Sequence, residues 1–130
     1  MTTQVCRKCC IEKDLSEFSY RNDNKKHRSE CKLCRATTEA AKRYNVTVGD
    51  IELLKEKQRN CCAICGTHAD DIPHKSFSHN PLVIDHDHET GEVRALLCPT
   101  CNSGLGHFKD SPELLIKAAK YLTYHKRMKR

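Results

Sequence analysis

Two sets of paired cysteines are the feature that most constrains how this chain can fold. Each set holds two Cys-x-x-Cys pairs: the first is Cys6, Cys9, Cys31 and Cys34, and the second is Cys62, Cys65, Cys98 and Cys101. Two such pairs can surround one tetrahedral Zn²⁺, and four thiolates leave no open position for catalysis. We therefore expect two structural zinc ions. Cys10 and Cys61 adjoin predicted ligands, and spacing alone leaves open whether either replaces its neighbour.

The supply of apolar side chains is small for a chain of 130 residues. Only 38% of them are hydrophobic and 5% aromatic, and there is no tryptophan. We expect metal to supply part of the folding free energy, because the core is poor and suitably spaced thiols are many. A disulfide-rich secreted scaffold is the competing interpretation. The polar beginning is unlike a signal peptide, and no apolar run approaches the roughly 18 residues of a membrane span, so we expect a soluble, intracellular protein with no membrane partner.

Positive charge is concentrated at the two ends of the chain. Residues 1–44 contain 11 Lys and Arg against 6 Asp and Glu, residues 45–110 contain 6 against 10, and residues 111–130 contain 6 against 1. Basic ends on an acidic middle suit a protein that holds a polyanion at its edges and a hard cation at its centre. Ordinary solvated surfaces show similar charge maps, so this pattern is supporting information only.

We expect a small α+β, zinc-stabilised protein made of four segments. In order, they are an N-terminal zinc ribbon at residues 1–36, a helical connector at 37–60, a compact module at 61–110 and a basic C-terminal helix at 111–130. The ribbon is too polar to hold together without metal. The connector is expected to pack either against the compact module or against a second copy of the chain.

Local signals place the elements inside these segments. In the compact module, the apolar runs 82–84 and 92–97 flank a turn at residues 89–91, which predicts a β-hairpin. A helix is expected to follow from Cys98-Pro99.

Two further helix starts are visible. Thr47 and Asp50 have the spacing of a capping box, and Ser111-Pro112 is a favourable start for the last helix. One apolar face of that last helix is expected to comprise Leu114, Leu115, Ala118, Tyr121, Leu122 and His125.

The residues best suited to chemistry lie within the second cysteine set. Asp85-His86-Asp87-His88 follows an apolar run, and Asn102 follows Cys101 directly. Asp85 and Asn102 offer oxygen ligands of the kind that Mg²⁺ prefers, and they leave positions for water and a phosphate. A neutral His86 beside them can take a proton from an attacking water. This set predicts phosphodiester hydrolysis, whereas a charged loop without function is the plainer alternative.

The neighbours Asp85 and His86 raise one geometric difficulty. On a regular strand, successive side chains point to opposite faces. Both can serve one site only if the strand ends or bends at this point, which we expect.

Residues 62–108 closely resemble the phage recombination endonuclease VII family, which belongs to the His-Me finger (HNH, ββα-metal) nucleases. The resemblance rests on Cys62-Ala63-Ile64-Cys65-Gly66 and on Asp85-His86-Asp87-His88-x-Thr90-Gly91-x-Val93-Arg94-x-Leu96-Leu97-Cys98-x-x-Cys101-Asn102-x-x-Leu105-Gly106. It implies a ββα-metal core in which the second cysteine set binds the structural zinc.

The resemblance also implies roles for single residues. Asp85 and Asn102 match the ligands of a catalytic Mg²⁺ or Mn²⁺, His86 matches the general base, and His88 matches a histidine that assists at the phosphate. Leu105 departs from the family's best-known member, which has an acidic residue there, and the departure bears on junction resolution more than on hydrolysis.

We therefore expect a metal-dependent endonuclease, of phage origin by family analogy, that nicks duplex DNA or cuts branched DNA. A homodimer would suit cuts across a symmetric junction. The competing function is a non-catalytic double zinc-ribbon adaptor that binds nucleic acid. Arg94 is suited either to a DNA phosphate or to a surface salt bridge. Further backbone contacts are expected from the last helix, through Lys117, Lys120, Lys126 and Arg127.

Overall fold

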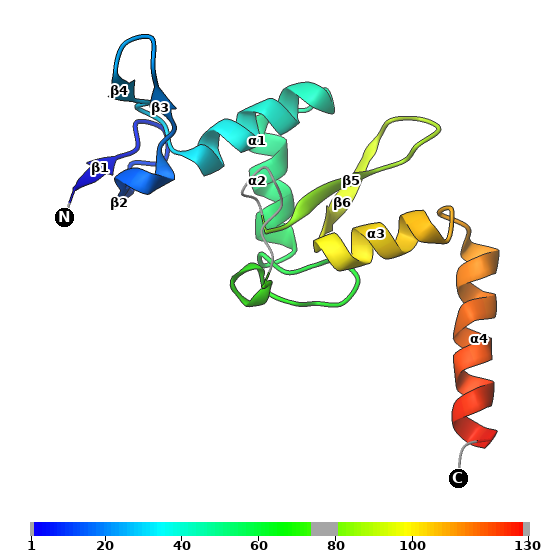
Figure 1. Ribbon diagram of the computed structural model, residues 1–130. Coiled ribbons are helices and arrows are strands. Elements are labelled where there is room, and N and C mark those ends of the chain that lie inside the picture. Colours follow the sequence, from blue (N-terminus) through cyan, green and yellow to red (C-terminus); the bar gives the residue numbers. More distant parts are fainter. Residues whose placement is uncertain (1, 74–80, 129–130) are drawn as a thin grey trace.

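The computed structural model describes residues 2–73 and 81–128. Its N-terminal region is a small ribbon (Figure 1). The strands pair as two antiparallel hairpins, β1 (Thr3–Val5) with β2 (Glu12–Asp14) and β3 (Tyr20–Arg21) with β4 (Lys26–His27). A short 3-10 helix, η1 (Leu15–Glu17), follows β2. Among the residues of the ribbon that the structure describes, the buried cluster consists of Phe18, Cys6 and Cys31, so the cysteines themselves form most of its core.

Helix α1 (Lys32–Arg43) begins inside the first cysteine set. The Cys31 side chain caps it by accepting the N–H of Cys34, and Ala36 and Ala41 lie on its buried face. The helix runs without a break across the segment boundary that we place between residues 36 and 37. The ribbon is therefore joined to the rest of the chain by a continuous helix, and the segment limits stay predictions.

Helix α2 (Val48–Lys57) begins with the predicted capping box. The Thr47 hydroxyl accepts the N–H of Asp50 at 3.0 Å, and the Asp50 carboxylate accepts the N–H of Thr47 at 2.9 Å. Ile51 is buried, and Leu54 packs against the core of the compact module. Of the two positions expected for the connector, α2 occupies the one within its own chain.

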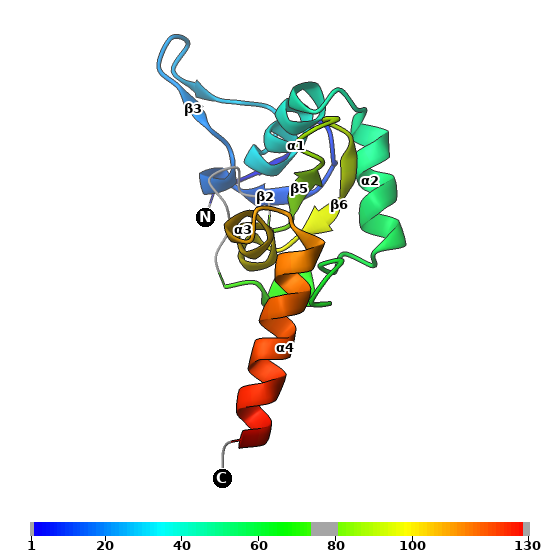
Figure 2. The same ribbon diagram turned by 90° about the vertical axis from the view of Figure 1, so that its right-hand side faces the viewer.

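The compact module is a two-stranded hairpin followed by a helix. β5 (Val83–His86) pairs antiparallel with β6 (Val93–Leu97), and α3 (Pro99–His107) contacts both strands. The hairpin lies between α2 and α3 (Figure 2). The buried cluster beneath it consists of Cys62, Ala69, Leu82, Leu96, Leu97 and Cys98, with Ala69 contributed by the 3-10 helix η2 (Ala69–Asp71). The expected hairpin and helix are thus confirmed.

Helix α4 (Pro112–Met128) extends away from the rest of the molecule in both views (Figures 1 and 2). The Ser111 hydroxyl accepts the N–H of Leu114 at 3.2 Å, as expected for a cap. None of the residues 112–128 is buried, and Tyr121 and Leu122 are 64% and 58% exposed. The expected apolar face is present, but no other part of the described chain covers it.

Across residues 2–73 and 81–128, no helix has both the length and the apolar character that a membrane crossing requires.

Candidate functional site

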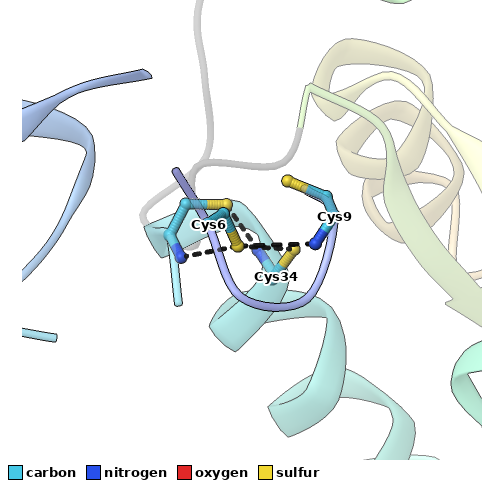
Figure 3. A group of neighbouring side chains, drawn as sticks. Cys6, Cys9 and Cys34 are labelled. Atoms are coloured by element: carbon cyan, nitrogen blue, oxygen red, sulfur yellow. Dashed lines mark hydrogen bonds between the residues drawn. The ribbon is translucent and has the colours of Figure 1, made fainter. Parts of the chain in front are cut away.

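The first cysteine cluster is assembled by the ribbon and the start of α1. The sulfur atoms of Cys6, Cys9, Cys31 and Cys34 all lie within 4.8 Å of one another. Figure 3 shows three of these side chains, Cys6, Cys9 and Cys34. The buried Cys6 sulfur accepts N–H groups from Lys8, Cys9 and Cys31 at 3.3–3.5 Å. Burial alone would raise the pKa of the Cys6 thiol, but these donors outweigh it and lower the pKa to about 6. A thiolate held in this way is suited to Zn²⁺.

The second cluster joins the hairpin to α3. The sulfur atoms of Cys62, Cys65, Cys98 and Cys101 also lie within 4.8 Å of one another. The sulfur of Cys65 lies 3.1 Å from the Thr67 hydroxyl, and this hydrogen bond lowers the pKa of the thiol to about 6. Cys98 follows β6 directly and caps α3 by accepting the N–H of Cys101 at 3.4 Å. A zinc ion here would tie the end of β6 to the start of α3.

The two remaining cysteines lie outside both clusters. Cys10 is exposed and has a backbone φ of 61°, and the Cys61 thiol donates to the carbonyl of Arg59 at 3.3 Å. The two sulfur clusters contain Cys9 and Cys62 and not their neighbours Cys10 and Cys61. All ten cysteines are free thiols, and two groups of four sulfur ligands fit two structural zinc ions.

Strand β5 ends at His86, and the pairing register of the hairpin shifts between Asp85 and His86. Asp85 lies opposite Ala95 whereas His86 lies opposite Val93, which leaves Arg94 as an extra residue on β6. Strand β5 therefore ends at this point, as expected. The bulge lies on the partner strand, and a bulge bends the strand that carries it, here β6 opposite Asp85 and His86.

Asp85 is the most deeply placed acidic residue of the hairpin, with 7% of its surface exposed. Its carboxylate accepts two hydrogen bonds from Arg94, from Nε at 2.6 Å and from Nη2 at 2.9 Å. The same Nη2 donates to the carboxylate of Asp110 at 3.1 Å. Of the two roles that the sequence left open for Arg94, the structure shows the salt bridge, in a partly buried setting.

His86 lies close to two other rings. The centroid of the Tyr44 ring is 4.9 Å from that of His86, and the His88 ring is 4.7 Å away on the hairpin. Tyr44 ends α1, so the connector contributes directly to the surroundings of the predicted base. Sequence reasoning missed Tyr44, since 42 residues separate it from His86 and no local pattern marks it.

Asn102 lies in the first turns of α3, one residue after a cysteine of the second cluster. Together with Tyr44 and Ile84 it lines a cavity of about 280 Å³. Asn102 therefore shares a cavity with Tyr44, whose ring contacts His86, and with Ile84, which precedes Asp85 in β5. The joint coordination of a cation by Asp85 and Asn102 stays a prediction.

Asp110 is an acidic residue of this region that sequence reasoning also missed. It follows α3, and besides its bond to Arg94 its carboxylate lies 3.9 Å from Nε2 of His88. Asp87, His88, Arg94 and Asp110 line a hollow of about 470 Å³ on this side of the hairpin. A carboxylate so close to Arg94 could not be placed from sequence, because Asp110 reads there as part of a helix start.

The remaining residues predicted for the site are Leu105 and four basic residues of α4. Leu105 packs against the buried cluster of the module, so the side chain at this position is part of the core. Four basic residues are exposed along α4: Lys117, Lys120, Lys126 and Arg127.

A hairpin with Asp-His at the end of its first strand, followed by a helix that carries an asparagine, is the arrangement of the ββα-metal, or His-Me finger, class. The family model described as recombination endonuclease VII matches residues 37–124. The chain belongs to the recombination endonuclease VII family, which confirms the resemblance drawn from its sequence.

Two phage proteins and one solved structure are similar to this chain. The Gene 59 proteins of Mycobacterium phages D29 and L5 are 35% and 33% identical to it over 101 residues, which cover 74% of this chain and 57% of each relative. The crystal structure of the ββα-Me type II restriction endonuclease Hpy99I matches at 26% identity and a TM-score of 0.40, covering 95% of this chain and 66% of that one. The chain thus spans little more than half the length of these phage relatives.

Proposed function

We propose that this chain is a DNA endonuclease that depends on Mg²⁺ or Mn²⁺ and hydrolyses phosphodiester bonds in duplex or branched DNA. Membership of the recombination endonuclease VII family supports the reaction class. The observation that carries the proposal is the register shift between Asp85 and His86, in a hairpin that α3 contacts and the second cysteine cluster clamps. Such a clamp supplies the rigidity that a small module needs to hold a base and a metal ligand in place.

In this proposal His86 takes the proton of the attacking water. The rings of Tyr44 and His88 lie close to the His86 ring and restrict its orientation. His88, whose side chain is 69% exposed, is free to reach a phosphate at the surface. The base thus lies at the boundary between the packed hairpin and the DNA.

Asp85 and Asn102 would hold the catalytic cation. The residues fit this role, because both offer oxygen atoms and Asn102 is fixed one residue from a zinc ligand. When bound, the cation would stabilise negative charge on the phosphate and on the leaving 3′ oxygen. The expected products carry 5′-phosphate ends.

Plasmid nicking tests the reaction. With Mg²⁺, the zinc-loaded wild type should convert supercoiled plasmid to the nicked form, and His86→Ala should lose this activity at unchanged DNA affinity. His107→Ala is the matched control, because it removes an exposed imidazole from the end of α3 in the same module. DNA binding without cleavage by the wild type would favour the competing function, a non-catalytic double zinc-ribbon adaptor.

The preferred DNA structure is tested by a panel at fixed salt: a four-way junction, a flap, a nicked duplex and a plain duplex. We expect nicking or branched-DNA cleavage, with backbone contacts from the basic side of α4. Cuts across a symmetric junction need two sites related by a twofold axis, so we also propose a homodimer, to be measured by light scattering. The phage relatives support action in the cytoplasm of an infected host cell.

A further inference from the structure

Arg94 stands between two carboxylates at the edge of the proposed active site. It forms a two-pronged ion pair with Asp85 and a third hydrogen bond with Asp110. Side-chain exposure rises from 10% at Asp85 through 22% at Asp110 to 38% at Arg94, so the inner pair is the more shielded. Two-pronged arginine–carboxylate pairs are among the stronger hydrogen bonds in proteins.

This geometry has a consequence for any cation that binds Asp85. Both carboxylate oxygens of Asp85 already accept hydrogen bonds from Arg94. Each oxygen keeps a further lone pair for a cation, but the guanidinium lies 2.6–2.9 Å from both oxygens, and its positive charge opposes a second positive charge there. A cation therefore binds more tightly when Arg94 has moved away, and its apparent affinity is reduced by the small fraction of molecules in that state. Arg94 acts as an internal competitor for the proposed cation site.

Asp110 gives the displaced guanidinium a place to go. It already accepts a hydrogen bond from Nη2 at 3.1 Å, on the outer side of Arg94. Because arginine presents several donors in a planar fork, Arg94 can release Asp85 and keep its charge paired with Asp110. Asp87 lines the same hollow, but Asp110 is the carboxylate that, besides Asp85, already accepts a hydrogen bond from Arg94.

The geometry points to Asp110 as a positioning residue that draws Arg94 off Asp85 when the catalytic cation binds. This inference rests on the proposed function, since it concerns the cation site of that reaction. Asp110 affects the cation site only by holding Arg94, and it contacts neither the cation nor the substrate.

Cation binding in the absence of DNA tests the inference. The zinc-loaded wild type and its variants are titrated with Mn²⁺, and free Mn²⁺ is followed by electron paramagnetic resonance. Asp110→Asn should weaken binding by at least about twofold, the lower end of the coupling between residues in contact. Glu89→Gln is the control, because it removes one negative charge from the same hollow at a residue whose side chain is exposed.

The same titration in an Arg94→Gln background separates the exchange from general electrostatics. Arg94→Gln should bind Mn²⁺ more tightly than the wild type, and the additional effect of Asp110→Asn should shrink to that of Glu89→Gln. Arg94→Lys provides a second background if the glutamine variant folds poorly, since a lysine keeps the charge but lacks the fork. Zinc content and circular dichroism establish folding for each variant.

The outcomes are distinct. An effect of Asp110→Asn that is equally large with and without Arg94 would overturn the inference, because it would make Asp110 an ordinary nearby charge. A wild type that nicks DNA with Mg²⁺ but shows no difference between Asp110→Asn and Glu89→Gln in Mn²⁺ affinity would overturn the inference and leave the proposed function standing. A wild type that binds no Mn²⁺ and cuts no DNA would overturn the proposed function, and the inference with it.

Discussion

The side chain of Gln58, at the end of α2, is hydrogen-bonded to both backbone groups of Leu96 in β6. Its Nε2 donates to the Leu96 carbonyl at 2.9 Å, and its Oε1 accepts the Leu96 N–H at 2.9 Å. Nε2 also donates to the carbonyl of Cys61 at 2.9 Å. Gln58 therefore satisfies the free edge of β6 as a neighbouring strand would, and it holds the connector against the proposed nuclease hairpin.

Gln58→Ala should destabilise the chain by about 1–3 kcal/mol, because it leaves the N–H of the buried Leu96 without its partner, whereas the Leu96 carbonyl keeps the N–H of Ala63 at 3.1 Å. Urea unfolding of the zinc-loaded protein measures this difference. Lys57→Ala, at the exposed neighbouring position, should change the free energy of unfolding by no more than about 0.5 kcal/mol. Equal effects of the two substitutions would show that the Gln58 bonds contribute nothing net.

Zinc content should distinguish neighbouring cysteines. Native mass spectrometry is expected to find two zinc ions in the wild type and in Cys61→Ser, but one in Cys62→Ser. The reason is that the Cys62 sulfur lies within its cluster whereas the Cys61 thiol is turned to the carbonyl of Arg59. Loss of zinc from Cys61→Ser would contradict the assignment.

Zinc uptake should release protons at neutral pH. Burial raises the pKa of the Cys34 thiol, and it raises that of Cys101 to about 12, so both are protonated until metal takes the place of the proton. Zinc affinity should therefore rise with pH and fall on acidification. Calorimetry in two buffers of different ionisation enthalpy measures the protons released, and identical heats in both buffers would argue against this account.

The basic side of α4 should carry part of the salt dependence of DNA binding. If Lys117 and Lys120 each neutralise one phosphate, replacing both with alanine should reduce the slope of log K against log salt by about 2. Lys57→Ala, on α2, is the control and should leave the slope unchanged. An unaltered slope in the double variant would remove α4 from the DNA-binding surface.

Much of the local structure could be predicted because its signals lie within a few residues of one another. The capping box at Thr47, the cap at Ser111 and the turn after Asp87 each depend on bonds between near neighbours. The hairpin and α3 were predicted for the same reason. For α4 the apolar pattern was read correctly, but a pattern on one helix does not tell whether another element covers it.

The residues of the candidate site could be predicted from the sequence, but the contacts that they make could not. Asp85, His86 and Asn102 were singled out by residue type and by their places beside the cysteines. The contacts around them could not be found, because Tyr44, which contacts His86, and Asp110, which binds Arg94, follow helices elsewhere in the sequence. Family membership supports the reaction class and leaves these contacts unspecified.

The amino-acid sequence by itself determined the two cysteine sets, the helix caps and the Asp85-His86 pair, since spacing and residue type along the chain are enough for each. Only the tertiary structure decided that Cys62 joins the cluster in place of Cys61, that Gln58 binds Leu96, and that Arg94 links Asp85 to Asp110. The physical reason is that such contacts depend on the direction in which a side chain points. That direction is set only where a strand shifts register or a helix ends in the folded chain.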